Sequence, residues 1–491
     1  MSESNTSKAV RGMSSQTLVT LILGIVEIVS FSIMSRLLSQ SDFGYYAAIS
    51  AITIVFTSFS ETGIGSAIIQ RKEISSCYIN NAFTLSFIFG TAIMLLMLAT
   101  AKPLANMVAD ASLTIPLMIM SVTLLCNCMS SVNTSIMYRR MEFMSVGIIN
   151  LTSLVITTIV AVVLAIYGLG YYAILTKAVL TSVITFVLSL IMAKTRFSFV
   201  LDKSTFRDIF GFSGWLMASV FFRNMAQQLD KLLMGNLLSV SSLGAYNRPK
   251  EFINTITSKL GSIFDSALFP VLSQIQDNKK SIARAYLRSM YYLNISSIVF
   301  ALGFIFNSEL IIRIFFGQEW LHILPVFNII SLSIVFNFDA RLADCYLRSL
   351  GLTRQQFSFR ILEIILKIAG LLLGFKGGIE GVAISVVITN FTTVIMKHVY
   401  LSKIVSISLL QGIKKLVSSW QVTLFILPIM IPSVLFLPHD ITGNIVTAFI
   451  FLITVIVSFL FAPEIVGREY KSGVYSKVRS LVIDKIHKFI K

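Results

Sequence analysis

The stretch 211–276 holds the side chains of this sequence that are best able to do chemistry. It has the length and apolar content of two membrane helices, yet many polar and charged groups interrupt it. Those groups are Arg223, Asn224, Gln227, Gln228, Asp230 and Lys231 in the first half and Arg248, Lys250, Glu251, Asn254, Lys259 and Asp265 in the second. A charge at the centre of a membrane helix costs roughly 2.5–3.5 kcal/mol on insertion scales. These side chains therefore need a wet or protein-lined place to face.

The spacing of these groups gathers them on helix faces. Arg223, Gln227 and Asp230 follow one another at i, i+4 and i+7, which places them on one face of a helix. A second face is predicted on the next helix, and its members are Glu251, Thr255, Ser258, Ser262 and Asp265. We interpret the two faces as the wall of a water-filled cavity.

Cations in or beside the predicted spans are candidate ligands for an anionic cargo. The predicted substrate-binding residues are Arg223, Lys231, Arg248, Lys259 and Arg341. Arginine binds phosphate through paired donors and lysine binds it as a point charge. The alternatives for any one cation are an intramembrane salt bridge, such as Arg341 with Asp344, or snorkelling from a helix end.

Acidic groups within the spans are candidates for coupling transport to an ion gradient. Glu27 lies near the middle of the first predicted span, and Asp230 lies within the polar stretch. Both are predicted ion-coupling residues; a structural hydrogen bond to a neighbouring helix is the alternative for Glu27. Glu61 and Lys177 are the other in-span charges of the first half.

The sequence lacks three motifs that are typical of enzymes. It lacks a phosphate-binding Gly-x-x-x-x-Gly-Lys-Ser/Thr loop, a His-Glu-x-x-His zinc pair and a Gly-x-Ser-x-Gly nucleophile elbow. The four histidines are scattered at His322, His398, His439 and His487. We predict no catalytic residue, no metal and no cofactor, so binding and movement are the expected activity.

Composition places the chain among integral membrane proteins. Of 491 residues, 55% are hydrophobic and only 13% are charged, against about 25% charged in soluble proteins. Apolar blocks of about 20 residues predict an all-α fold with about fourteen transmembrane helices. The predicted spans are 18–38, 43–65, 80–100, 112–134, 145–167, 171–193, 212–238, 245–272, 289–312, 323–346, 357–375, 379–400, 420–437 and 441–462.

The distribution of basic residues predicts the orientation of the chain. Lys and Arg, Lys397 among them, gather in alternate connections and in the tail after 462, while the other connections hold only Arg36, Lys102, Arg313 and Lys376. The positive-inside rule then puts both termini in the cytoplasm. The net charge of +17 is then accounted for by cytoplasmic Lys and Arg residues that contact anionic lipid headgroups. We therefore expect no nucleic-acid partner.

An internal repeat at an offset of 200 predicts the domain organisation. Residues 36–46 and 236–246 are identical at six of eleven positions, among them Ser39 with Ser239 and Gly44 with Gly244. Both copies sit at the turn that follows the first helix of a six-span block, which indicates parallel repeats. The predicted domains are a six-helix bundle over 1–200, a second over 201–405, and two further helices with a basic tail over 406–491.

Several strings in matching order carry a resemblance to a known family. They are Arg36 with Asp42-Phe43-Gly44, Gly63-Ile64 through Ile68-Ile69-Gln70-Arg71-Lys72-Glu73-Ile74-Ser75, Phe212-Ser213-Gly214-Trp215-Leu216, Leu243-Gly244-Ala245-Tyr246, Leu268-Phe269-Pro270, Gln276-Asp277 and Phe316-Gly317-Gln318-Glu319-Trp320. Over most of 10–405 the chain resembles the Wzx-type polysaccharide exporters, the family of the colanic acid exporter. After about 405 only the hydropathy agrees.

The resemblance implies the multidrug/oligosaccharidyl-lipid/polysaccharide transporter superfamily, in which two six-helix bundles face a central cavity and work by alternating access. It implies a flippase for an undecaprenyl-pyrophosphate-linked oligosaccharide in a bacterial inner membrane, with a polysaccharide polymerase and a chain-length regulator as candidate partners. It does not fix which basic residues grip the cargo. Two other hypotheses stay open: a cation-coupled multidrug exporter on the same fold, and a non-transporting partner of polysaccharide assembly.

Overall fold

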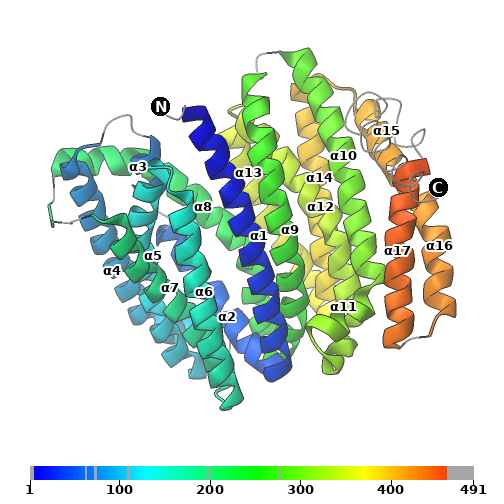
Figure 1. The fold of residues 1–491 in the computed structure, drawn as a ribbon, viewed down its shortest axis with the longest axis horizontal. Helices are drawn as coiled ribbons and strands as arrows, with labels where there is room; N and C mark the ends of the chain where they lie inside the picture. The colour runs from blue at the N-terminus through cyan, green and yellow to red at the C-terminus, as the bar shows by residue number, and fades with distance from the viewer. Residues whose placement is uncertain are drawn as a thin grey trace, which may run out of the picture. The chain divides into compact units, whose positions relative to one another are not determined.

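Every regular element in the described part of the chain is helical, which confirms the predicted all-α class (Figure 1). The computed structural model describes residues 5–60, 64–70, 74–107, 111–195, 198–200, 202–275, 278–438 and 440–461. Its long helices are α1 (Asn5–Leu37), α2 (Gln40–Ser60), α4 (Ser76–Met107), α5 (Thr114–Arg139), α6 (Phe143–Ile166), α7 (Tyr171–Ala193), α8 (Lys203–Leu237), α9 (Val240–Gln274), α10 (Lys279–Phe306), α12 (Leu324–Ser349), α13 (Thr353–Gly374), α14 (Gly378–Ile404), α16 (Thr423–Phe436) and α17 (Ile441–Phe461).

Each of the fourteen predicted spans overlaps one of these long helices. The shorter helices between them are α3 (Ile64–Gln70), α11 (Ser308–Phe315), α15 (Leu409–Ser419) and the 3₁₀ turns η1 (Ala111–Leu113), η2 (Gln318–Ile323), η3 (Phe375–Gly377) and η4 (Trp420–Val422). Ten helical segments of the described chain are long and apolar enough to cross a membrane. Helices α8 and α9, which hold the polar stretch 211–276, are not among the ten.

The chain folds into two compact units, each made of two pieces of sequence. Unit 1 comprises Met1–Lys259 and Arg360–Val386, and unit 2 comprises Leu260–Phe359 and Val387–Lys491. The predicted division into 1–200, 201–405 and 406–491 follows the repeat in the sequence, and it stays a prediction.

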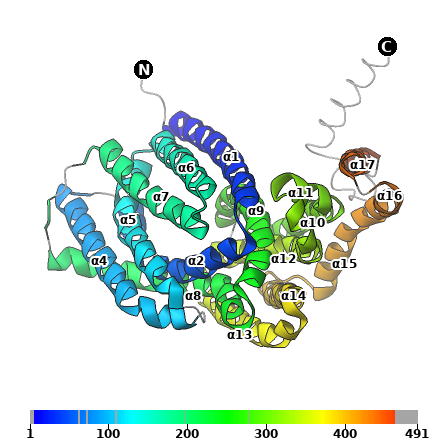
Figure 2. The same ribbon diagram turned by 90° about the horizontal axis from the view of Figure 1, so that it is seen from below.

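Unit 1 is built around a row of packed helices. Helix α4 packs on α5, α5 packs on α7, α7 packs on α6 and α6 packs on α1. The row can be followed from α4 to α1 in Figure 2. Helix α2 packs against both α5 and α8, so it joins the row to the polar stretch. Asn224 of α8 donates to Ser58 Oγ of α2 at 3.0 Å within this contact.

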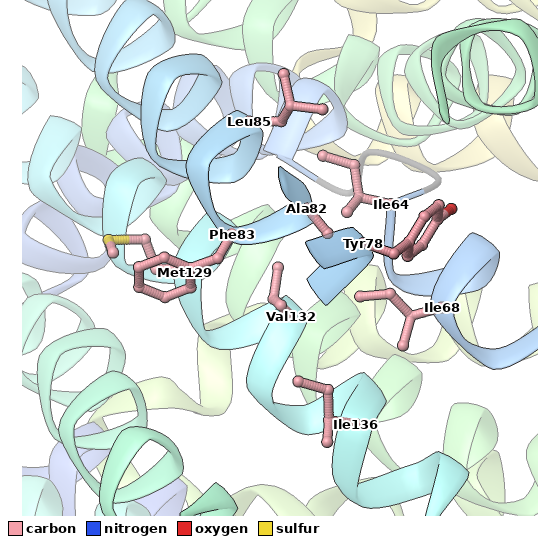
Figure 3. Close-up of a cluster of buried hydrophobic side chains, with 9 residues drawn as sticks. All are labelled: Ile64, Ile68, Tyr78, Ala82, Phe83, Leu85, Met129, Val132 and Ile136. Atoms are coloured by element: carbon pink, nitrogen blue, oxygen red, sulfur yellow. The ribbon is translucent and has the colours of Figure 1, made fainter. Parts of the chain in front are cut away.

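An apolar cluster fixes the short helix α3 in unit 1 (Figure 3). Its buried members are Ile64, Ile68, Tyr78, Ala82, Phe83, Leu85, Met129, Val132 and Ile136, which come from α3, α4 and α5. Because lipid tails are as apolar as these side chains, their association within a bilayer gains from close packing and little from the hydrophobic effect. Arg139 at the end of α5 donates to the carbonyl of Ile68 at 3.0 Å and so closes the end of α3.

The repeated segments 36–46 and 236–246 meet each other in unit 1 as a symmetric pair. Ser39 and Asp42 cap the start of α2, with the Asp42 carboxylate accepting from the Ser39 hydroxyl at 2.6 Å. At the start of α9 the Ser239 hydroxyl accepts from the Ser242 N–H at 3.1 Å. A Cβ added to Gly44 would overlap the carbonyl of Val240, and one added to Gly244 would overlap the carbonyl of Gln40. Each contact maps onto the other at the offset of 200.

Unit 2 is centred on α10 and α12, which pack along their lengths. Helix α15 contacts α10, and α16 packs on α17, which in turn contacts α10 and α11. A capping box of Ser408 and Gln411 begins α15. Unit 2 also buries several polar side chains between α10, α12 and α14, among them Asn294, Asp339 and Lys397.

Candidate functional site

Helix α9 carries a stripe of polar side chains that other helices of unit 1 do not cover. Asn254 and Ser258 are exposed, and Glu251, Thr255 and Lys259 are half-buried. The opposite side of the helix is apolar and buried, as at Phe252 and Ile253. Glu251, Thr255 and Ser258 thus share an accessible face, as their spacing predicts. Contact with hydrocarbon would leave these groups without hydrogen-bond partners, so the stripe needs water or a polar ligand.

At one end of this stripe, α9 forms an ion pair with α1. Lys259 Nζ lies 3.1 Å from Glu27 Oε1, and their side chains are 33% and 34% exposed. A carboxylate and an ammonium that are one-third exposed can exchange partners with a ligand at lower cost than a buried pair, because water already reaches both. Glu27, a predicted ion-coupling residue, therefore directly contacts Lys259, a predicted substrate-binding residue.

A second lysine contacts α1 one helical turn further along. Lys177 of α7 donates to the hydroxyl of Ser30, and Thr158 of α6 donates to the same hydroxyl at 3.3 Å. Lys177 also interacts electrostatically with Glu27, Glu251 and Arg248. We call Glu27, Ser30, Lys177 and Lys259 the α1 polar cluster. The sequence had marked Lys177 as an in-span charge, but nothing in its spacing pointed to Ser30.

Arg248 is buried and tethers α9 to α1. Its guanidinium donates to Ser35 Oγ through Nε at 3.1 Å and through the second amino group at 2.8 Å, and that amino group also donates to the Phe31 carbonyl at 2.8 Å. The guanidinium carbon lies 3.3 Å from the ring centre of Phe31 and 4.0 Å from that of Phe43. Glu251 lies 3.4 Å from it on the side of the polar stripe. In this geometry the hydrogen bonds of the Arg248 guanidinium go to protein partners. Its contact with cargo stays a prediction.

Replacing Arg248 with lysine tests the tether. Lysine keeps the charge, but a single ammonium cannot reproduce the forked bonds to Ser35 and Phe31 or the stacking on two rings. We expect Arg248→Lys to lower the free energy of unfolding by about 1–3 kcal/mol, the range for a lost charge-assisted hydrogen bond. Unfolding by titration with sodium dodecyl sulfate in mixed micelles measures this. Unchanged stability in Arg248→Lys would contradict the tether and leave a role in cargo binding.

Asp230 lies at a buried junction of α8, α9 and α13. Its Oδ2 accepts from the Tyr246 hydroxyl at 2.8 Å and contacts the Lys250 ammonium. Its other oxygen is buried without a hydrogen-bond partner among the described residues. Lys367 of α13 donates to the Ala226 carbonyl at 2.9 Å in the same junction. The predicted shared face of Arg223, Gln227 and Asp230 is therefore wrong for Asp230, because Tyr246 and Lys250 draw it into the protein.

The remaining predicted cations are Arg223 and Lys231 on α8 and Arg341 on α12. Arg223, Gln227 and Lys231 follow one another at four-residue steps along α8. Arg223 and Gln227 are exposed, and Lys231 is half-buried. Arg341 belongs to unit 2, where its guanidinium lies against Gly261 of α9; a Cβ on Gly261 would meet its carbon at 2.5 Å. Asp344, the alternative partner predicted for Arg341, pairs with Lys397 of α14 at 2.8 Å.

Several predicted residues lie outside the described part of the chain, and the sequence assigned one buried residue to a connection. Glu61, Arg71 and Lys72 lie outside the described residues, as does the tail after 461. Lys397, assigned above to a basic connection, is 1% exposed within α14. The available signal was its position three residues inside the predicted span 379–400.

The fold is shared with transporters of known structure. The lipid II flippase MurJ in an inward closed conformation matches 92% of this chain and 99% of its own, with a TM-score of 0.73 and 14% identity. An inward-facing multidrug resistance transporter of the MATE family matches 79% of this chain and 98% of its own, with a TM-score of 0.63 and 13% identity. At these identities the likeness establishes the fold.

Sequence relatives share most of the chain. The lipopolysaccharide biosynthesis protein WzxC of Escherichia coli (strain K12) is 20% identical over 81% of this chain and 81% of its own. The teichuronic acid biosynthesis protein TuaB of Bacillus subtilis (strain 168) is 21% identical over 67% of this chain and 68% of its own. A family model described as polysaccharide biosynthesis protein matches residues 33–325. The chain therefore belongs to the polysaccharide biosynthesis protein family, as its motifs predicted.

Proposed function

We propose that this protein is a flippase that moves an undecaprenyl-pyrophosphate-linked oligosaccharide from the cytoplasmic to the periplasmic leaflet by alternating access. Family membership and the fold shared with a lipid flippase support transport of a glycan precursor and do not favour an enzymatic reaction. The observation that carries the proposal is the α1 polar cluster beside the accessible polar stripe of α9. A membrane protein keeps such groups uncovered where water and a polar cargo must pass.

The charge of this region suits a phosphate-bearing cargo. Lys177, Lys259 and Arg248 supply three cations against the two carboxylates of Glu27 and Glu251, which leaves an excess of one positive charge. Lysine binds phosphate as a point charge, and its flexible stem lets it follow a moving headgroup. Arg248 holds α9 against α1, and Lys177 and Lys259 are the two ammonium groups that we assign to the pyrophosphate.

Glu27 provides a way to couple cargo binding to protons. While Glu27 is ionised, it competes with phosphate for the Lys259 ammonium. A proton taken up by Glu27 removes that competitor, so Lys259 is released to the cargo; loss of the proton restores the pair and favours cargo release. This assigns Glu27 the ion-coupling role, whereas Asp230 is committed to Lys250 and Tyr246 and serves the junction of α8, α9 and α13.

The proposed location is a bacterial inner membrane with both termini in the cytoplasm. The excess of Lys and Arg in alternate connections supports that orientation. A polysaccharide polymerase and a chain-length regulator are the proposed partners, because a flipped repeat unit needs an enzyme that joins it to a chain.

Neutralising Lys259 tests the assignment in cells. We expect Lys259→Gln to reduce surface polysaccharide about tenfold to a hundredfold in a deletion strain, since a hydrogen bond to a charged group contributes about 1.5–3 kcal/mol. Surface polysaccharide is quantified per copy of protein in the membrane. Lys376→Gln is the matched control, because Lys376 is an exposed lysine outside the cluster, and it should export as the wild type does. Normal export by Lys259→Gln would refute the phosphate assignment.

A cation-coupled multidrug exporter is the second candidate, and one observation favours it. Glu27 of α1 and Glu251 of α9 are two carboxylates with accessible side chains, and organic cations bind such groups. A drug-susceptibility panel distinguishes the two functions: a deletion strain that becomes drug-sensitive but keeps its polysaccharide would favour the exporter. A non-transporting scaffold is distinguished by the location of lipid-linked repeat units, which accumulate in the cytoplasmic leaflet only when a flippase is lost.

A further inference from the structure

Unit 2 contains a buried carboxylate whose environment differs from that of the other buried aspartates. Asp339 lies near the middle of α12 and is 3% exposed. Its Oδ1 accepts from Nδ2 of Asn294 on α10 at 2.7 Å. Asp230 and Asp344 each contact a lysine ammonium. Among the described residues, Asp339 has a neutral amide where those two have a cation.

The described charged groups on α12 and on the elements around it do not contact the Asp339 carboxylate. On α14, Lys397 pairs with Asp344, and the His398 ring contacts the Tyr286 hydroxyl of α10. Arg341 of α12 itself lies against Gly261 of α9. The other charged groups described on α12 and on the elements around it include Arg348 of α12, Lys279, Lys280, Arg284 and Arg288 of α10, Lys403 of α14, the Arg313–Glu309 pair of α11, and Glu319 and His322 of η2. Tyr286 of α10 interacts electrostatically with Asp339. None of them supplies Asp339 with a positive charge in contact.

An ionised carboxylate in this position is costly. Burial away from water penalises the charged form by several kcal/mol, and one hydrogen bond from a neutral amide offsets only part of that. The protonated acid is uncharged and avoids the penalty. Within the interior of a membrane helix bundle, the neutral form of Asp339 is therefore the stable one until water or a conformational change reaches it.

Asn294 can serve both protonation states of its neighbour. Its Nδ2 donates to the carboxylate, while its Oδ1 is buried without a hydrogen-bond partner among the described residues. Rotation of the amide by half a turn exchanges the two atoms in space, since they have nearly the same shape. The amide oxygen then accepts from the O–H of the protonated acid. The pair can therefore form a hydrogen bond in both states: the amide N–H donates to the carboxylate, and the amide oxygen accepts from the protonated acid.

We propose that Asp339, together with Asn294, is a proton-binding site in unit 2 that takes up and releases a proton during each transport cycle. The carboxylate binds one proton from water on one side of the membrane to become the neutral acid, and it returns that proton to water on the other side. The site is distinct from Glu27, which lies in unit 1. This inference rests on the proposed transport function for its role, whereas the proton itself is measurable without transport.

Infrared difference spectroscopy tests the proton directly on the purified full-length protein. We expect the wild type at neutral pH to show the C=O stretching band of a protonated carboxyl group, and Asp339→Asn to lack it. Asp440→Asn is the matched control: Asp440 is an exposed helix cap of unit 2 and asparagine caps equally well, so the band should persist. A band unchanged in Asp339→Asn would overturn the proposal.

A second variant keeps the test decisive if Asp339→Asn does not fold. Asn294→Ala retains the carboxyl group but removes the amide, whose hydrogen bond to the ionised carboxylate is stronger than the one to the neutral acid. We expect the protonated band to persist to a pH about one unit higher than in the wild type, as for one hydrogen bond to a charged group. An unchanged or lowered pH of disappearance would show that Asn294 does not bind the ionised form.

Transport in proteoliposomes separates this inference from the proposed function. We expect the wild type to move a lipid-linked oligosaccharide faster under an imposed proton gradient. This increase in rate should be at least tenfold smaller in Asp339→Asn, and it should be unchanged in Asp440→Asn. Equal gradient responses in the wild type and Asp339→Asn would overturn the coupling while leaving the flippase intact. A wild type that moves no lipid-linked oligosaccharide would refute the proposed function, and the infrared band would still decide the proton site.

Discussion

Replacing Lys397 with methionine should lower the free energy of unfolding by about 3–5 kcal/mol, the range for breaking a buried ion pair by removing one partner. Lys397 is 1% exposed and its ammonium lies 2.8 Å from Asp344, so the substitution leaves a carboxylate in the protein interior without its ammonium. Methionine fills a similar volume, which separates the loss of charge from the creation of a cavity. Unfolding in mixed micelles with increasing sodium dodecyl sulfate measures the change.

Two further variants identify the cause of that loss. Asp344→Asn combined with Lys397→Met removes both charges and should recover most of the lost stability, because the buried carboxylate that lost its lysine is gone. Lys403→Met is the matched control, since Lys403 is an exposed lysine near the end of the same helix and should change stability by less than about 0.5 kcal/mol. A double variant no more stable than Lys397→Met alone would show that packing and not charge holds α12 to α14.

Replacing Gly44 with alanine should also be strongly destabilising, because α2 and α9 touch backbone to backbone at that point. The added Cβ would overlap the Val240 carbonyl oxygen and lie 2.7 Å from its carbon. Overpacking usually costs about 1–3 kcal/mol, and here the neighbour is backbone that cannot rotate away. Gly244→Ala should have a similar effect, since its Cβ would lie 2.9 Å from the carbonyl carbon of Gln40. Thermal unfolding of the purified variants checks both.

Gly24 supplies the control for this pair. It lies in α1 with nothing within 4 Å of an added Cβ, so Gly24→Ala should be neutral or stabilising by up to about 1 kcal/mol through helix propensity. If Gly44→Ala and Gly24→Ala unfold at the same temperature, the close approach of α2 and α9 does not exist in the folded protein.

The sequence was sufficient to predict where the helices run. Apolar blocks with the length of a bilayer leave no alternative to helices, because every backbone group in lipid must be bonded within its own segment. The repeat at 36–46 and 236–246 was also visible, since both copies need the same serine cap and the same glycine. Their mutual contact could not be predicted, because sequence identity between two segments does not indicate that they are in contact.

The partners of the charged residues could not be predicted from spacing. Asp230 has the same helical phase as Arg223, yet Tyr246 and Lys250 bind it in the interior while Arg223 stays exposed. Arg248 seemed a cargo ligand, yet Ser35 and Phe31, more than 200 residues away in sequence, take its donors. Helical periodicity gives the direction of a side chain but not which neighbour lies there, and that depends on how distant helices pack.

The partner of Glu27 was likewise out of reach of the sequence. Its place in the middle of an apolar span marked it as exceptional. This signal is strong because a charge in lipid is costly. That Lys259 would meet it required the pairing of α1 with α9. The pairing brings a predicted coupling residue and a predicted cargo ligand into one ion pair, and the proposed exchange between proton and phosphate depends on it.

Transfer of a lipid-linked oligosaccharide between leaflets, measured with purified protein in proteoliposomes, tests the account most directly. An undecaprenyl-pyrophosphate-linked oligosaccharide placed in the outer leaflet is followed by its protection from a membrane-impermeant glycosidase. We predict that the protected fraction rises with time in wild-type vesicles and rises about tenfold to a hundredfold more slowly with Lys259→Gln. Wild-type vesicles that protect no more than protein-free ones, although the protein is folded, would contradict the account.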